Sequence, residues 1–364
     1  MKLGFGMMRL PRVEGTKDID LEHTKRMVDA FIEAGGKYFD TAYVYEGSEA
    51  ATKAALCDRY PRESYYLADK LNASDFACKS EEEAKNEINV SLQRSGAGYF
   101  DFYLLHGIDT GNREKYTQYG IWEYMRKLKE EGLIRHYGFS FHSTPELLDQ
   151  LLTEHPDIEF VQLQINYSDW EDPLIASRKC YEVATRHGKP VIVMEPVKGG
   201  KLADPPQQAK DVLLQSNPDA SCASWAMRFA ASLPNVMMVL SGMSSMEQME
   251  DNLKSMRHFQ PLSEEEQKVL EEARQALLQF DGIACTSCHY CTPGCPMDIH
   301  IPEIFAVMNV YKMFGNLEEA RNEYRWRPGG EKASACIQCG QCENACPQHL
   351  PIISLLEEVA ETLE

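Results

Sequence analysis

The sequence contains no apolar run that approaches membrane-spanning length, which is about 20 residues for a helix. Its first residues, Met-Lys-Leu-Gly-Phe-Gly-Met-Met-Arg-Leu-Pro, lack both the apolar core and the small-residue cleavage site of a secretory signal. Low-complexity tracts and long like-charge blocks are absent as well. We therefore expect no membrane partner and a cytoplasmic location.

Positive charge is scarce. The chain has 37 Lys and Arg residues against 56 Asp and Glu residues, which leaves a formal net charge of −19. A protein that binds DNA or RNA needs a basic face to meet the phosphates. This imbalance predicts that nucleic acid is not a partner.

The length of the chain points to more than one domain. Its 364 residues exceed one ordinary core but fit a barrel of roughly 250 residues plus a small module. We expect two domains, residues 1–282 and 283–364, with a hinge at Asp281–Gly282.

Cysteine, by contrast, is abundant and unevenly placed. Eight of the twelve cysteines form two copies of the pattern Cys-x-x-Cys-x-x-Cys-x-x-x-Cys-Pro, which start at Cys285 and Cys336. This spacing is typical of two [4Fe-4S] clusters, in which the fourth cysteine of each run binds the other cluster. Thiolates that bind iron belong in a reducing compartment, which again favours the cytoplasm.

The spacing predicts two crossed ligand sets. The first is Cys285, Cys288, Cys291 and Cys346, and the second is Cys336, Cys339, Cys342 and Cys295. Structural zinc and disulfides are the alternatives. Zinc sites use paired Cys-x-x-Cys units rather than runs of four with a trailing proline, so the cluster interpretation is favoured.

Before the first cysteine run, short β-rich segments alternate with amphipathic helical stretches, which is typical of βα units on a parallel sheet. The predicted strands are Leu3–Met7, Tyr38–Ala42, Tyr65–Lys70, Asp101–His106, His136–Phe141, Phe160–Asn166, Pro190–Glu195 and Val236–Gly242. Helices are predicted between them, as at Glu22–Ala34, Glu81–Arg94, Tyr119–Glu131 and Ile175–His187. Eight such units predict an α/β fold, a (β/α)8 TIM barrel.

The region after the barrel is predicted to be mainly helical. A helix at Ser263–Phe280 follows the last βα unit, and the stretch between the two cysteine runs has helical spacing at Ile304–Phe314 and Leu317–Tyr324. A further helix is expected at Ile352–Leu363. This small C-terminal iron–sulfur domain resembles the α-helical ferredoxin type, in which helices pack around two clusters.

Four reactive side chains fall at the ends of neighbouring predicted strands. Asp40 lies near the end of the second predicted strand, Lys70 and His106 end the third and fourth, and Tyr45 lies in the loop after the second. In a parallel barrel these ends meet at one face, where catalytic residues gather. Each residue alone is more often structural, but four in register indicate an acid–base cluster. A nearby ammonium favours phenolate, so Lys70 is expected to lower the pKa of Tyr45.

The segment Asp-Thr-Ala-x-x-Tyr from Asp40 to Tyr45, followed by the strand-end Lys70 and His106, resembles the aldo-keto reductase superfamily over residues 2–280. The resemblance implies an oxidoreductase that reduces the carbonyl group of an aldehyde or ketone. Tyr45 would be the general acid, Lys70 paired with Asp40 would tune it, and His106 would orient the carbonyl.

The resemblance also implies a nicotinamide dinucleotide, NADP(H) or NAD(H), bound across the barrel mouth without a Rossmann fingerprint. Ser140 and Gln162 match the residues that hold the carboxamide, and Lys198 and Gly199 match the loop that approaches the pyrophosphate. The segment that matches the adenosine end contributes Gly242, Ser244, Gln248 and Asn252. It also has the pattern of a helix start capped by serine, which is compatible with binding.

Two positions depart from the family pattern. Phe141 stands where an asparagine usually follows the carboxamide serine, and Met194 replaces the aromatic residue that stacks on the nicotinamide. Residues 242–252 also contain no Lys or Arg to hold a 2′-phosphate. The choice between NADP and NAD is therefore open, and so is a flavin in place of either.

The fusion of barrel and clusters leaves three hypotheses. In the first, the barrel is a nicotinamide-dependent carbonyl reductase that the clusters tune or complete. In the second, the clusters relay single electrons between an external carrier, such as a ferredoxin or flavodoxin, and a cofactor or substrate in the barrel. In the third, the chain is an electron-carrier subunit with a non-catalytic barrel.

Overall fold

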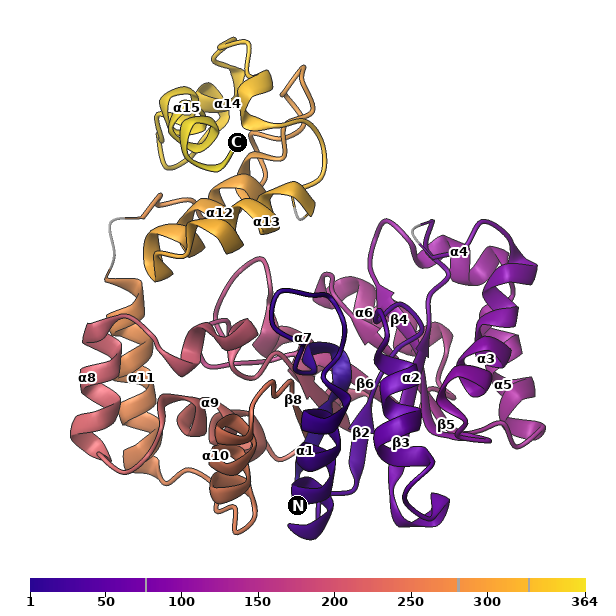
Figure 1. The fold of residues 1–364 in the computed structure, drawn as a ribbon. Coiled ribbons are helices and arrows are strands. Elements are labelled where there is room, and N and C mark those ends of the chain that lie inside the picture. Colours follow the sequence, from indigo (N-terminus) through magenta and orange to yellow (C-terminus); the bar gives the residue numbers. More distant parts are fainter. Residues whose placement is uncertain (76, 280–281, 327) are drawn as a thin grey trace. The chain divides into compact units, whose positions relative to one another are not determined.

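The computed structural model describes residues 1–75, 77–279, 282–326 and 328–364 (Figure 1). The chain folds into two compact units, one of residues 1–203 and 216–270 and one of residues 204–215 and 271–364. The predicted domain boundary near Gly282 stays a prediction. Phe280 and Asp281, the latter part of the predicted hinge, lie outside the described residues.

The first unit contains a closed parallel barrel in which every strand pairs with its sequence neighbours and β1 pairs with β8. The predicted (β/α)8 barrel is confirmed. The strands are β1 (Leu3–Gly6), β2 (Tyr38–Asp40), β3 (Tyr66–Leu71), β4 (Phe100–Ile108), β5 (Ile134–Phe141), β6 (Phe160–Gln164), β7 (Val191–Met194) and β8 (Val236–Ser241). Each starts within two residues of its predicted position.

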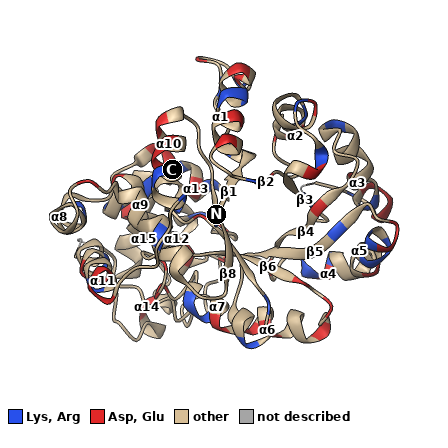
Figure 2. Cartoon of the chain, turned by 90° about the horizontal axis from the view of Figure 1, so that it is seen from below, with Lys and Arg blue, Asp and Glu red and all other residues tan. Residues whose placement is uncertain are grey.

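Helices surround the barrel strands (Figure 1). They are α1 (Leu21–Glu33), α2 (Ser48–Thr52), α3 (Glu81–Ser95), α4 (Arg113–Gln118), α5 (Ile121–Glu130), α6 (Pro145–Glu154), α7 (Ser177–Arg186), α9 (Cys222–Ser232) and α10 (Met246–Met256). Short helical turns are η1 (Met7–Arg9), η2 (Lys53–Cys57), η3 (Arg62–Ser64) and η4 (Lys198–Ala203). Helices α1, α3 and α5 carry both acidic and basic residues (Figure 2).

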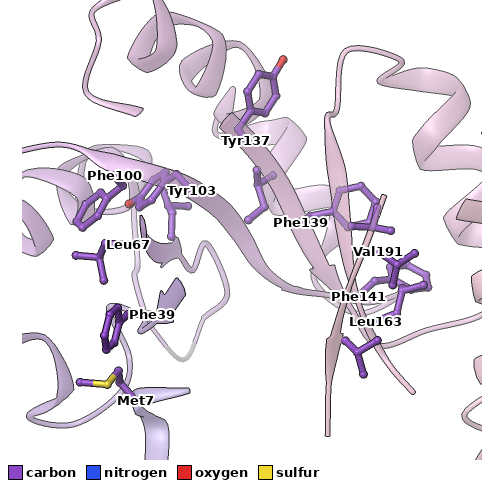
Figure 3. Close-up of a cluster of buried hydrophobic side chains, with 14 of the residues drawn as sticks. Met7, Phe39, Leu67, Phe100, Tyr103, Tyr137, Phe139, Phe141, Leu163 and Val191 are labelled. Carbon is purple, nitrogen blue, oxygen red and sulfur yellow. The ribbon is translucent and has the colours of Figure 1, made fainter. Parts of the chain in front are cut away.

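Side chains along each strand alternate between two cores, because successive residues of a strand point to opposite faces. The inner core fills the barrel with one residue from each of six strands, namely Tyr38, Ala68, Leu104, Phe160, Ile192 and Leu240. The outer core packs the strands against the helices, and Figure 3 shows part of it, including Phe39, Leu67, Tyr103 and Phe139. This alternation decides which residues reach the barrel mouth.

The second unit is mainly helical, as predicted. Its helices are α8 (Gln207–Ser216), which ends one residue beyond this unit, then α12 (Ile301–Phe314), α13 (Leu317–Trp326), α14 (Gln341–Ala345) and α15 (Ile352–Leu363), with the turn η5 (Ala333–Ala335). Helix α11 (Glu264–Leu278) has its first residues in the first unit. A separate apolar core joins α12, α13 and α15 through residues such as Phe305, Ala320 and Leu356.

Within the described ranges, no helix combines the length and the apolar character needed to cross a bilayer.

A buried carboxyl group on α3 links the stability of the barrel to pH. Glu87 is 1% exposed, and its Oε2 accepts a hydrogen bond from the backbone N–H of Asn72 at 2.7 Å. Burial raises the pKa of Glu87 to about 8, which the hydrogen bond from Asn72 only partly opposes. The folded protein therefore prefers the protonated form of Glu87 more strongly than the unfolded chain does.

We predict that this preference makes the barrel less stable as the pH rises from about 5 to 8. A group whose folded pKa is raised stabilises fully below its unfolded pKa and loses that contribution on passing through the folded pKa, at about 1.4 kcal/mol per unit. Glu87→Gln should remove this loss, so its melting temperature should exceed that of the unaltered chain by several degrees at pH 8.5 but not at pH 5. Glu82→Gln, on the exposed face of the same helix, is the control. Parallel melting curves for Glu87→Gln and the unaltered chain would contradict the prediction.

Candidate active site

The strand alternation delivers three of the predicted catalytic residues to the barrel mouth. Asp40, Lys70 and His106 each lie two residues beyond an inner-core residue, so they share the inner face at the carboxyl ends of their strands. The barrel register aligns Asp40 with Ala68 and Lys70 with Leu104. The predicted cluster on neighbouring strands is therefore assembled.

Lys70 forms a buried ion pair. Its Nζ lies 2.6 Å from Asp40 Oδ1 and also donates to the carbonyl oxygen of Thr41 at 2.6 Å, and the Lys70 side chain is only 1% exposed. Burial by itself would lower the pKa of Lys70, but the negative charges of Asp40 and its neighbours outweigh burial and raise it. Lys70 is thus held as an ammonium inside the protein.

Tyr45 lies beside this ammonium. The loop after β2 turns back through a hydrogen bond from the Tyr45 N–H to the carbonyl of Ala42 at 3.0 Å, which brings the Tyr45 ring centroid to 4.8 Å from Lys70 Nζ. Burial raises the pKa of Tyr45, and the charge of Lys70 opposes that rise without reversing it. Lys70 therefore lowers the pKa of Tyr45 as expected, but burial raises it by more.

His106 completes the group. Its ring packs edge-on against that of Tyr45 with centroids 5.6 Å apart. Burial, then the charge of Lys70 and then that of His142, holds the pKa of His106 well below its ordinary value. Its Nδ1 is buried and has no hydrogen-bond partner within the described ranges. His106 is thus a neutral imidazole at neutral pH, able to donate one hydrogen bond to a ligand.

All four residues line one cleft at the barrel mouth, so they face the same volume.

The two predicted carboxamide residues also line this cleft. Ser140 Oγ accepts a hydrogen bond from the Gly107 N–H at 2.7 Å, and Gln162 lies next to Ser140 in the β5–β6 register. Gln162 is 3% exposed, and its Oε1 is a buried acceptor with no partner in the described chain. An unpaired buried acceptor is costly unless a ligand donates to it, so Gln162 fits a carboxamide N–H₂ group.

The loop after β7 meets the cleft through glycines rather than through its first lysine. Gly199 and Gly200 line the cleft with positive φ angles of 65° and 105°. The predicted phosphate ligand Lys198 is instead ion-paired with the buried Asp169 and is not among the residues that line the cleft. Its role toward a pyrophosphate stays a prediction.

The four residues predicted for the adenosine end line the cleft as well, namely Gly242, Ser244, Gln248 and Asn252. Gln248 Oε1 accepts from the Ser244 N–H at 2.7 Å, and Asn252 donates to Ser241 Oγ at 2.9 Å. The helix start that the sequence indicated is α10, whose capping residue is Ser245.

Some residues that line the cleft were not identified from the sequence. They are Met8, Arg9, His142, Glu195 and Asp251, among others. Arg9 and His142 each follow a barrel strand closely, as Tyr45 does, so their position after a strand end was the available signal. Phe141, the departure noted above, faces the outer core, whereas Met194 lines the cleft.

The eight cysteines of the second unit line two separate cavities. One is lined by Cys285, Cys288, Cys291 and Cys346, and the other is lined by Cys295, Cys336, Cys339 and Cys342. Each cavity thus draws three cysteines from one run and the fourth from the other run. The spacing predicts the same grouping, and the binding of a cluster by each set stays a prediction.

The chemistry of each cavity fits a cluster better than a single ion. Within the described part of the chain, no three His, Cys, Asp or Glu side chains come together closely enough to hold one metal ion. A four-iron cluster takes one thiolate at each iron, so its ligands stand further apart. The loops turn through positive φ at Ser287, His289 and Gln338, a conformation that forms N–H-lined concavities at many iron–sulfur sites.

Comparisons with known proteins also divide the chain into a barrel and an iron–sulfur domain. A model described as "Aldo/keto reductase family" matches residues 2–275, and one described as "4Fe-4S dicluster domain" matches residues 284–350. An aldo-keto reductase of Mycolicibacterium vanbaalenii is 29% identical over 240 residues, which cover 66% of this chain and 80% of that protein.

Solved structures share the barrel. The holo form of aldo-keto reductase AKR11C1 from Bacillus halodurans superposes with a TM-score of 0.58 and 25% identity, covering 75% of this chain and 91% of that one. An aldo-keto reductase from Klebsiella pneumoniae in complex with NADPH superposes with a TM-score of 0.59 and 20% identity, covering 74% of this chain and 89% of that one. The second likeness concerns the fold alone.

We predict that the Lys70–Asp40 pair is strongly coupled. Lys70→Met leaves a buried carboxylate without its counter-charge, which should cost about 3–5 kcal/mol of stability. Adding Asp40→Asn should recover at least half of that loss. Thermal unfolding of the single and double variants measures this recovery, with Lys25→Met, which breaks the surface pair with Glu22, as a control expected to change little. A double variant no more stable than Lys70→Met would contradict the coupling.

The crossed ligand sets predict how iron is lost when two cysteines are removed together. Cys288→Ala with Cys346→Ala removes two ligands of one cluster, so the chain should keep about four irons in the other. Cys288→Ala with Cys295→Ala damages both clusters and should leave far less iron. Iron content and absorbance after anaerobic reconstitution measure the difference. Equal iron loss in the two double variants would contradict the crossing.

Proposed function

Because this chain belongs to the aldo/keto reductase family, we propose that its barrel reduces the carbonyl group of a small aldehyde or ketone with a nicotinamide cofactor, with Tyr45 as the proton donor. The observation that carries the proposal is the convergence of Tyr45, Lys70, Asp40 and His106 on one cleft. Four such groups around a single volume are what an acid–base site requires.

The residues of the cleft fit the cofactor. Ser140 and Gln162 would hold the carboxamide, and the unpaired Oε1 of Gln162 is the acceptor that such a group needs. Gly199 and Gly200 allow phosphate groups to approach the backbone closely. When bound, a reduced nicotinamide supplies the hydride that the carbonyl carbon accepts.

The chain's own residues would manage the proton. A raised pKa keeps the Tyr45 phenol protonated at neutral pH, which is the state that a proton donor needs. As the phenol O–H gives its proton to the carbonyl oxygen, the phenolate forms beside the Lys70 ammonium, whose charge stabilises it. Asp40 holds Lys70 in place, and neutral His106 donates a hydrogen bond to the same carbonyl oxygen, so the substrate is oriented before the proton moves.

The dicluster domain adds iron–sulfur chemistry that hydride transfer alone does not require. We propose that the clusters tune or complete the reductase. A single-electron relay to a ferredoxin or flavodoxin is the second candidate, and it is favoured by the exposure of one cysteine at each cluster cavity, Cys288 and Cys339. Family membership and the assembled catalytic group oppose the third hypothesis, a carrier with a non-catalytic barrel.

We predict that Tyr45→Phe lowers kcat/KM for aldehydes by about 10²- to 10⁴-fold, because the ring stays but the proton donor is lost. Anaerobic assays with NADPH, NADH and a panel of aldehydes measure the effect. Tyr43→Phe is the matched control, since Tyr43 lies in the same loop but packs against Arg94 outside the lining of the cleft.

Undiminished turnover by Tyr45→Phe would contradict the proton-donor role. Flavin absorbance in the purified protein, or turnover driven by reduced viologen without nicotinamide, would instead support the relay.

A further inference from the structure

The residues predicted to bind the cofactor leave the cleft short of positive charge for phosphate groups. Nucleotide phosphates are anions, the chain carries a net charge of −19, and Asp40, Glu195 and Asp251 line the cleft. The cations that line it are Lys70, which is committed to Asp40, and Arg9. Arg9 forms no ion pair within the described ranges of the chain.

Arg9 is held firmly at the rim by its backbone. It ends the turn η1 directly after β1, where Ser48 Oγ donates to the carbonyl of Met7 at 2.9 Å and Ser244 Oγ donates to the carbonyl of Arg9 at 2.6 Å. The aliphatic stem of Arg9 lies about 3.5 Å from the point where a side chain on Gly242 would begin. The η1 turn is thus fastened to the segment that starts at Gly242.

The place of Arg9 relative to the carboxamide residues decides which phosphate it meets. Ser140 and Gln162 lie on β5 and β6, whereas Arg9 lies against the residues that follow β8, with β7 between the two groups. A dinucleotide whose nicotinamide reaches Gln162 therefore extends its other half toward Ser244 and Arg9. That segment, residues 242–252, has three carboxylates and no Lys or Arg.

Resting on the proposed nicotinamide function, we propose that Arg9 selects the cofactor by binding the 2′-phosphate of NADPH. A guanidinium offers paired N–H donors that match phosphate oxygens and stays charged at every working pH. Asp251, a carboxylate that lines the same cleft, accepts a hydrogen bond from Ser221 Oγ at Oδ2 with a distance of 2.6 Å. Arg9, in the turn that follows β1, thereby supplies the positive charge that residues 242–252 lack.

The test is calorimetric titration of the full, cluster-loaded chain under anaerobic conditions with 2′,5′-ADP, ADP and 5′-AMP. A hydrogen-bonded charged pair contributes about 1.5–3 kcal/mol, so Arg9→Ala should weaken 2′,5′-ADP binding by about 10- to 100-fold. Binding of ADP and 5′-AMP should change less than about twofold, because neither carries the 2′-phosphate. Arg9→Lys should keep part of the affinity.

Arg12→Ala removes an exposed guanidinium three residues further along the same segment and serves as the matched control. Unchanged 2′,5′-ADP binding by Arg9→Ala would overturn the assignment, and an equal loss with ADP would overturn it in favour of a diphosphate contact. Failure of the unaltered chain to bind NADPH or NADH would instead overturn the proposed cofactor, and the Arg9 assignment with it.

Discussion

The site depends on a geometric constraint, namely that all eight strands of a closed parallel barrel end at the same rim. Residues two apart on a strand share a face, so each side chain that follows an inner-core residue at the end of a strand points into the mouth. Tyr38 is followed in this way by Asp40, Ala68 by Lys70 and Leu104 by His106. Residues far apart in the sequence are thereby gathered around one volume without any loop having to carry them.

Burial then sets the charge of each group. Lys70 stays an ammonium because Asp40 and neighbouring negative groups outweigh its burial, and its charge acts on both Tyr45 and His106. The Lys70 charge opposes the rise that burial causes in the pKa of Tyr45, and it adds to the fall that burial causes in the pKa of His106. The Lys70–Asp40 pair therefore contributes to the protonation state of both Tyr45 and His106, although burial is the larger cause of each pKa shift.

Most of the fold and of the candidate site could be predicted from the sequence. The same physical reasons explain which residues were not identified. The strands were found because their period-two pattern is strong. Asp40, Lys70 and His106 stood out because each is a polar residue at the end of a strand. Arg9 and His142 were missed because their position just after a strand is the only local signal, and many ordinary surface residues share it. Lys198 was assigned from its neighbours in the loop, while its contact with Asp169 is made across 29 positions. The net pKa shift of Tyr45 depends on burial, which a strand pattern does not report.

The exchange of one cysteine between the two runs bears on how the protein is made. When synthesis has reached residue 295, neither cavity has all of its cysteines. The cavity of the first run still lacks Cys346, and the other cavity still lacks Cys336, Cys339 and Cys342. If the cysteines bind the clusters as predicted, iron loading has to wait until almost the entire polypeptide has been synthesised. Loss of even a short C-terminal stretch that includes Cys346 would then deprive the earlier run of its partner, so both halves of the module mature together.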